Sequence, residues 1–211
     1  MFLVVALHAH AAPPLAPALQ SELDRAVIEY EAGRTAPARQ AFESLARRGV
    51  PAAQYNLAVM HLRNELPNAS TATGLQWLDK AAKGGFVTAQ FMLAKTYDDG
   101  VLVARDLPLS LKWYEVAAVG GSSEAALALG TAHFLGRGTA KSPEQAARWF
   151  RQAATAGDVG AQYLLASMYE AGDGVARDLR LARYWYDVAA KNGDEAAPGK
   201  VKEMDAKLAG S

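Results

Sequence analysis

Four tryptophans recur at one interval along this chain. They stand at Trp77, Trp113, Trp149 and Trp185, so each lies 36 residues after the one before. An alanine pair follows each of them after four residues, and a glycine follows after eight. A constant interval of this length is typical of structural repeats, in which each unit buries its apolar face against its neighbours. The chain is therefore predicted to be a stack of similar units.

Each repeat has the pattern of two helices. The first carries an alanine, a leucine four residues later and an aromatic ring eight residues later, as in Ala161, Leu165 and Tyr169. This spacing places the three side chains on one face of a helix. The second helix carries the tryptophan, an adjacent aromatic residue or leucine, and the alanine pair. We predict that this second set, with the tryptophans, lies in the core between helices.

Glycines and capping residues mark the expected turns. The pairs within 136–138 and 172–174 follow a first helix, and glycine supplies the positive φ that closes a helix. In the first full repeat Asn64 stands at the corresponding position, so a different loop is expected there. The second helices are expected to begin after the capping residues Asp106, Ser142 and Asp178.

The repeat pattern divides the chain into four parts. Residues 51–194 hold four repeats of 36 residues. Residues 21–50 contain a shorter copy, which predicts an N-terminal capping helix pair. Residues 195–211 are highly charged and predict a C-terminal capping helix with one solvated face, as the end of a solenoid needs.

Residues 1–20 form the fourth part and contain no charged side chain. An apolar run followed by Ala9-His10-Ala11 or by Ala16-Pro17-Ala18 is similar to the core and cleavage site of a secretory signal, although no lysine or arginine precedes the run. The other interpretation is a disordered leader. We expect a periplasmic or secreted protein, and a cytoplasmic one if residues 1–20 are not a signal.

The composition excludes several classes of function. Lys and Arg number 22 and Asp and Glu also number 22, so the net charge is zero and a nucleic-acid partner is not expected. With no cysteine, disulfides and thiolate metal sites are excluded. No apolar run reaches the roughly 20 residues that span a bilayer. A monomer is favoured.

The repeat resembles a known family in its most regular copy. That copy runs Ala161-Gln-Tyr-Leu-Leu-Ala-Ser-Met-Tyr169-Glu-Ala-Gly172-Asp-Gly174-Val-Ala-Arg-Asp178, then Trp185-Tyr-Asp-Val-Ala-Ala-Lys-Asn-Gly193. This resembles the Sel1-like repeat, a relative of the tetratricopeptide repeat. The resemblance implies an all-α, right-handed superhelical solenoid of antiparallel helix pairs. It also implies an adaptor or scaffold that holds a protein or peptide partner, in bacteria often in the cell envelope.

Catalytic motifs are absent from the sequence. It contains no His-Glu-x-x-His, Gly-x-Ser-x-Gly, Ser-x-x-Lys or P-loop pattern. His61 and His133 occupy the tyrosine position of the first helix and are expected to be packed there with their polar edges hydrogen-bonded. We expect no enzyme activity and no catalytic, cofactor or metal site. Two alternatives remain open: a β-lactam- or peptidoglycan-active hydrolase, because some family members are described as binding penicillin, and a secreted effector that binds a host protein.

A partner is expected on the concave face formed by the first helices. A helical wheel places four positions per repeat away from the packing stripe. The candidate partner-binding residues are Tyr55, Val59, Leu62, Arg63, Phe91, Lys95, Asp98, Asp99, Thr131, Phe134, Leu135, Tyr163, Ser167 and Glu170. Phe134 and Leu135 are not required by the repeat pattern, and three of the others are acidic. A peptide with apolar anchors and a basic residue would suit this surface; the alternative is a patch covered by self-association or by the N-terminal segment.

Overall fold

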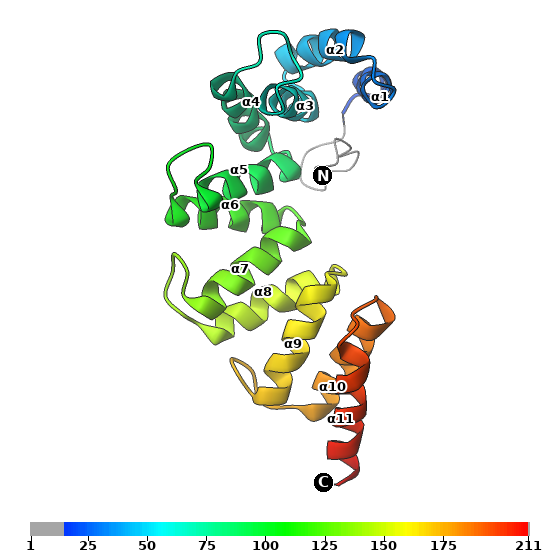
Figure 1. The fold of residues 1–211 in the computed structure, drawn as a ribbon, viewed down its shortest axis with the longest axis vertical. Helices are drawn as coiled ribbons and strands as arrows, with labels where there is room; N and C mark the ends of the chain where they lie inside the picture. The colour runs from blue at the N-terminus through cyan, green and yellow to red at the C-terminus, as the bar shows by residue number, and fades with distance from the viewer. Residues whose placement is uncertain (1–14, 211) are drawn as a thin grey trace. The chain divides into compact units, whose positions relative to one another are not determined.

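The structure is a computed structural model that describes residues 15–210, and every regular element in that range is an α-helix (Figure 1). The chain divides into two compact units, residues 1–106 and 107–211. The first unit contains α1 (Pro17–Glu31), α2 (Thr35–Arg47), α3 (Pro51–Leu62), α4 (Thr71–Lys83) and α5 (Val87–Asp99). The second contains α6 (Leu107–Val119), α7 (Ser123–Leu135), α8 (Pro143–Thr155), α9 (Val159–Ala171), α10 (Leu179–Lys191) and α11 (Ala197–Ala209).

Within each unit, every helix packs against the next one along the chain. The predicted all-helical stack of helix pairs is thereby confirmed. No helix among residues 15–210 has the length and apolar composition needed to cross a bilayer.

The first unit has a core that includes the N-terminal helix pair. Leu23, Phe42 and Leu57 are buried in it, and Leu15 and Leu19 pack against it. Helix α1 begins at Pro17, within the last four residues of the predicted leader. The expectations for residues 1–14 lie outside the described part of the chain.

The tryptophans are only half-buried, which corrects their assignment to the core. The residue after each tryptophan is the buried one: Leu78, Tyr114, Phe150 and Tyr186. In α4 the buried face runs through Gly74, Leu78, Ala81 and Ala82. Because successive helical residues are about 100° apart, the tryptophan lies at the margin of that face.

The predicted turns are largely confirmed. Gly136 and Gly172 close α7 and α9 in the left-handed conformation, with φ of 72° and 75°. The side chains of Ser142 and Asp178 accept hydrogen bonds from the first-turn amides of α8 and α10. The first repeat differs as expected, because Asn64 adopts a positive φ of 58° and the following loop buries Leu66.

Candidate functional site

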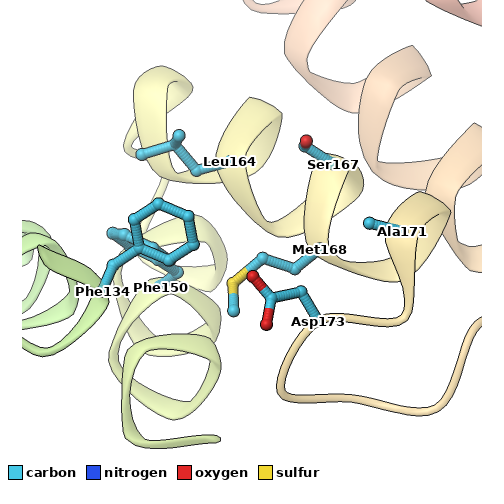
Figure 2. Close-up of a pocket in the computed structure, with 7 residues that line it drawn as sticks. All are labelled: Phe134, Phe150, Leu164, Ser167, Met168, Ala171 and Asp173. Atoms are coloured by element: carbon cyan, nitrogen blue, oxygen red, sulfur yellow. The ribbon is translucent and has the colours of Figure 1, made fainter. Parts of the chain in front are cut away.

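A pocket opens in the second unit, where α7, α8 and α9 meet (Figure 2). Its volume is about 70 Å³. The walls are the rings of Phe134 and Phe150, the apolar side chains of Leu164 and Met168, and the carboxylate of Asp173. Ser167 and Ala171 complete the lining. The pocket is thus apolar on most sides and carries one acidic group.

The aromatic wall is set by close packing between α7 and α8. A Cβ atom on Gly130 of α7 would overlap the ring of Phe150, which lies fully buried in the space that the glycine leaves. The ring of Phe134, near the end of α7, packs at a tilt against Phe150, with ring centroids 6.5 Å apart. Lys141 places its ammonium group 5.8 Å from the Phe134 ring centroid. Phe134 is therefore anchored on Phe150 and remains partly exposed to the pocket.

The turn after α9 brings Asp173 to the pocket. A Cβ atom on Gly174 would overlap the backbone of Pro143 at the start of α8, so this turn lies directly against α8. The amide of Asp173 donates a hydrogen bond to the carbonyl oxygen of Met168 at 3.1 Å. Figure 2 shows the Asp173 carboxylate beside the Met168 side chain. Among residues 15–210, no hydrogen bond or ion pair engages this carboxylate.

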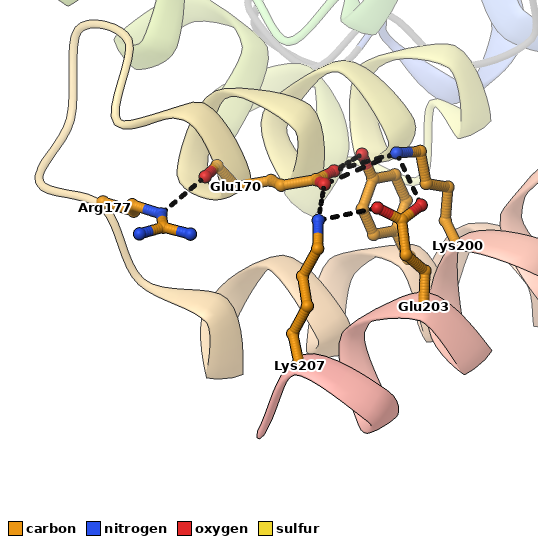
Figure 3. Close-up of polar contacts among 6 residues, drawn as sticks. Glu170, Arg177, Lys200, Glu203 and Lys207 are labelled. Atoms are coloured by element: carbon orange, nitrogen blue, oxygen red, sulfur yellow. Dashed lines mark hydrogen bonds and ion pairs between the residues drawn. The ribbon is translucent and has the colours of Figure 1, made fainter. Parts of the chain in front are cut away.

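A polar cluster lies where α9 and α10 meet α11 (Figure 3). Glu170 accepts hydrogen bonds from the Tyr186 hydroxyl at 2.9 Å, from Lys207 Nζ at 2.8 Å and from Lys200 Nζ at 3.2 Å. Glu203 accepts a hydrogen bond from Lys200 Nζ at 3.0 Å and from Lys207 Nζ at 2.6 Å. We call these five residues the Glu170 cluster.

The lysines hold Glu170 in its charged form. Partial burial by itself would raise the pKa of this carboxyl group, but hydrogen bonds from Lys207, Tyr186 and Lys200 outweigh the burial and lower the pKa to about 2. Burial and the neighbouring Glu170 carboxylate raise the pKa of the Tyr186 hydroxyl. The ion pairs of the cluster thus connect α11 to α9.

Two candidate partner-binding residues of the first unit prove to be buried. Tyr55 is 2% exposed and Val59 is 7% exposed, so neither can contact a partner. Helix α3 packs against both α2 and α4, and every residue from 53 to 60 is buried as a result. The Tyr55 ring packs against Phe86 at a centroid distance of 5.3 Å. The wheel assumed one buried face, whereas α3 has two.

The other candidates of the first unit keep exposed surface. They are Leu62, Arg63, Phe91, Lys95, Asp98 and Asp99. Arg63 lies 3.8 Å from Glu65, and Asp98 lies 4.0 Å from Arg105, so both charges have partners within the unit.

The candidates of the second unit separate into three groups. Phe134 and Ser167 line the pocket, and Leu135 is 63% exposed beside it in sequence. Thr131 bonds to its own helix and Tyr163 packs on Tyr186. Glu170 was expected to present a free acidic charge to a partner. That expectation is wrong, because Lys200 and Lys207 neutralise the carboxylate.

The two histidines follow their expected packing in part. The Nδ1 atom of His61 accepts a hydrogen bond from the Ser70 amide at 3.3 Å, and burial lowers the pKa of this imidazole. The Nδ1 atom of His133 is buried without a hydrogen-bond partner among the described residues. Within residues 15–210 no group of three metal-ligating side chains converges.

Comparison with known proteins identifies the family. The sequence model of the Sel1 repeat matches residues 51–86, 87–122, 123–158 and 159–194. The chain belongs to the Sel1 repeat family. No protein with a curated description is similar enough in sequence to count as a match.

Solved structures of Sel1 repeat proteins resemble this chain. A Sel1 repeat protein from Oxalobacter formigenes is 28% identical with a TM-score of 0.79, and the match covers 85% of this chain and 74% of that one. A protective antigen of uropathogenic Escherichia coli has the same identity and TM-score over 88% of this chain, but the match spans only 41% of that protein. An immunity protein from Pseudomonas aeruginosa shares the fold at 20% identity and a TM-score of 0.52, over 93% of this chain and 73% of that one.

The Sel1 repeat boundaries show that the pocket and the Glu170 cluster are equivalent places. The pocket lies between the third and fourth repeats, and the cluster lies between the fourth repeat and α11. A shift of one 36-residue repeat takes Phe134 to Glu170 and Phe150 to Tyr186. The same shift takes Leu164 to Lys200 and Met168 to Met204.

Three pocket residues were missed by sequence reasoning. Leu164 and Met168 project from α9 on a side that the wheel did not select, and Asp173 was considered only as a spacer between two glycines. The residue at position 164 carries no distinguishing signal, because the equivalent positions in the other three Sel1 repeats hold Asn56, Met92 and Ala128. Nothing in the sequence alone signalled that the turn would bring Asp173 to the pocket.

Proposed function

We propose that this chain is a non-enzymatic scaffold that binds a protein or peptide through the pocket between its third and fourth Sel1 repeats. The observation that carries the proposal is the pocket itself, with Phe134 and Leu164 exposed at its walls. Apolar groups left open to water on a folded domain mark interaction sites, and aromatic residues serve as their anchors. The adjoining Leu135 extends this apolar surface.

The side chains of the pocket favour binding over chemistry. Asp173 is its single titratable residue, and Ser167 carries its single hydroxyl group. A serine nucleophile needs a base within hydrogen-bond reach. Among the described residues no hydrogen bond joins Ser167 to Asp173 or to a histidine. A hydrolase of β-lactams or peptidoglycan has no comparable support in this geometry.

We further propose that the protein acts in the bacterial cell envelope or outside the cell. The uncharged, apolar residues 1–20 support this location. Helix α1 begins at Pro17 and Leu19 packs in the core, which favours processing before Pro17. The intact mass of the protein isolated from its native host tests the proposed processing. We expect this mass to show the loss of a segment that ends before Pro17. An unprocessed mass would contradict export by cleavage.

A peptide selection tests the binding function directly. Random heptapeptides displayed on phage are selected against the immobilised full-length protein and against Phe134→Glu. We expect enrichment of related sequences on the wild type and loss of that enrichment on the variant, with thermal unfolding confirming that both are folded. Hydrolysis of nitrocefin or peptidoglycan fragments that Ser167→Ala abolishes would overturn the proposal.

A further inference from the structure

The pocket holds an acidic group that nothing in the described chain neutralises. The Asp173 carboxylate faces a space bordered by Phe134, Leu164 and Met168. Apolar surroundings strengthen the attraction between such a carboxylate and a cation, because less water screens the two charges. Lys141, whose ammonium group lies 5.8 Å from the Phe134 ring centroid, forms no ion pair with Asp173 among residues 15–210.

The protein itself shows how the equivalent place one repeat later is filled. There the side chain of Lys200 extends over the ring of Tyr186, with Nζ 5.9 Å from the ring centroid. Its ammonium group ends on the carboxylate of Glu170, 3.2 Å away. Lys200 is the counterpart of Leu164, which is too short and too apolar to do the same in the pocket. A basic side chain over an aromatic ring therefore closes one position and is missing from the other. The acidic groups come from different places, because Glu170 is the counterpart of Phe134 and the counterpart of Asp173 is Ala209.

We propose that the pocket receives one lysine or arginine side chain of the partner. The inference rests on the proposed binding function and specifies its ligand. The aliphatic stem lies against Phe134, Leu164 and Met168, and the cation pairs with Asp173. Long basic side chains bury their stems on apolar surface in this manner, and aromatic rings attract the cation.

The dimensions agree with this ligand. A water-sized group needs about 10–15 Å³ of such volume, so a 70 Å³ pocket accommodates about five such groups. That is the size of a lysine side chain beyond Cα. An acidic side chain would instead meet the Asp173 carboxylate as a like charge, and a small polar residue would leave the apolar walls uncovered.

The first experiment compares two peptide selections. Random heptapeptides on phage are selected against the full-length wild type and against Asp173→Asn, which keeps the shape of the side chain and removes its charge. We expect lysine or arginine to be enriched at one position on the wild type, beside apolar residues. On Asp173→Asn the basic preference disappears and the apolar preference remains.

The outcomes separate this inference from the proposed function. Enriched peptides without a basic position, or with a basic preference that persists on Asp173→Asn, overturn the assignment of the cation to Asp173 and leave the binding function standing. If the wild type enriches no peptide family at all, the binding function itself fails.

A quantitative test uses the most enriched peptide and a synthetic analogue with norleucine in place of its basic residue. Asp173→Asn should lower the affinity for the basic peptide by about tenfold and leave the affinity for the norleucine analogue unchanged. Equal weakening of both peptides would show that the substitution acts on the shape of the pocket, and would contradict the ion pair.

A third variant fills the pocket with a basic side chain of the protein itself. Leu164→Lys places a lysine at the counterpart of Lys200, in the wall of the pocket, and should abolish capture of the basic peptide. Leu164→Met is the matched control and should bind normally. Full binding by a folded Leu164→Lys would contradict the proposed location. If that variant does not fold, the Asp173→Asn measurements decide.

Discussion

The pocket beside Phe134 and the Glu170 cluster occupy equivalent positions in successive repeats, yet one is open and the other is filled. Both are built around a buried ring, Phe150 in the pocket and Tyr186 in the cluster. The open position has Phe134 and Leu164 at its walls, and the filled position has Glu170 and Lys200 in their places. The two positions differ at several residues between copies of one repeat: Phe134, Leu164, Ser167 and Ala171 line the pocket where Glu170, Lys200, Glu203 and Lys207 form the cluster.

This difference shows how an end of the stack differs from its interior. Helix α11 buries only Ala197 and Met204 among its described residues, whereas α9 buries six. A helix with so little apolar burial gains little from the hydrophobic effect. The charges around Glu170 supplement that packing, while the interior repeats are held by their cores and can leave a position open for a ligand.

The largest expected effect tests whether the two positions share one core. Phe150→Ala and Tyr186→Ala should each destabilise the protein by about 3–5 kcal/mol, because each removes a buried ring and leaves a cavity. Chemical denaturation measures the loss, and Leu135→Ala, on an exposed side chain, should change stability by less than about 0.5 kcal/mol. If either ring variant leaves the free energy of unfolding almost unchanged, the pocket and the Glu170 cluster are not built around equivalent buried rings.

A smaller effect separates the charged position from the apolar one. Glu170→Gln should cost about 1 kcal/mol, since it replaces the charged carboxylate by a neutral amide and so removes the ion pairs with two lysines that are themselves partly exposed. The loss should shrink in 1 M salt, which screens the ion pairs. Glu195→Gln, an exposed glutamate in the same region, is the control. A loss of equal size in both variants would show that Glu170 has no special role.

The pH dependence of that contribution has a defined sign. The pKa of Glu170 is lowered from 4.5 to about 2 in the folded protein. Its stabilising contribution is therefore complete above pH 4.5 and is lost as the pH falls towards 2. The stability difference between wild type and Glu170→Gln should narrow across this interval. A difference that stays constant from pH 6 to pH 2 would contradict the ion-pair account.

The smallest effect on stability is expected at the pocket. Phe134→Glu should change the free energy of unfolding by no more than about 1 kcal/mol, because the side chain is partly exposed. Peptide capture should nevertheless fall sharply. Strong unfolding would show that Phe134 belongs to the core, and the contrast between an open pocket and a closed cluster would then fail.

Sequence reasoning succeeded where the structure depends on local chemistry. The repeat length, the left-handed Gly136 and Gly172, and the capping residues Ser142 and Asp178 follow from propensities within a few residues. It failed where a side chain meets a distant part of the chain. The burial of Tyr55 depends on helices on both sides of α3, and the neutralisation of Glu170 depends on lysines 30 and 37 residues later.

The sequence alone therefore determined a stack of helix pairs with a 36-residue period, because that period records which faces must be buried in every copy. Only the tertiary structure decided which copies differ. Phe134, Leu164 and Asp173 come from two helices and a turn, and their convergence depends on how closely Gly130 and Gly174 let the backbones approach. Such contacts form between different repeats. The order of residues along the chain does not say how far apart two side chains from different repeats lie in space.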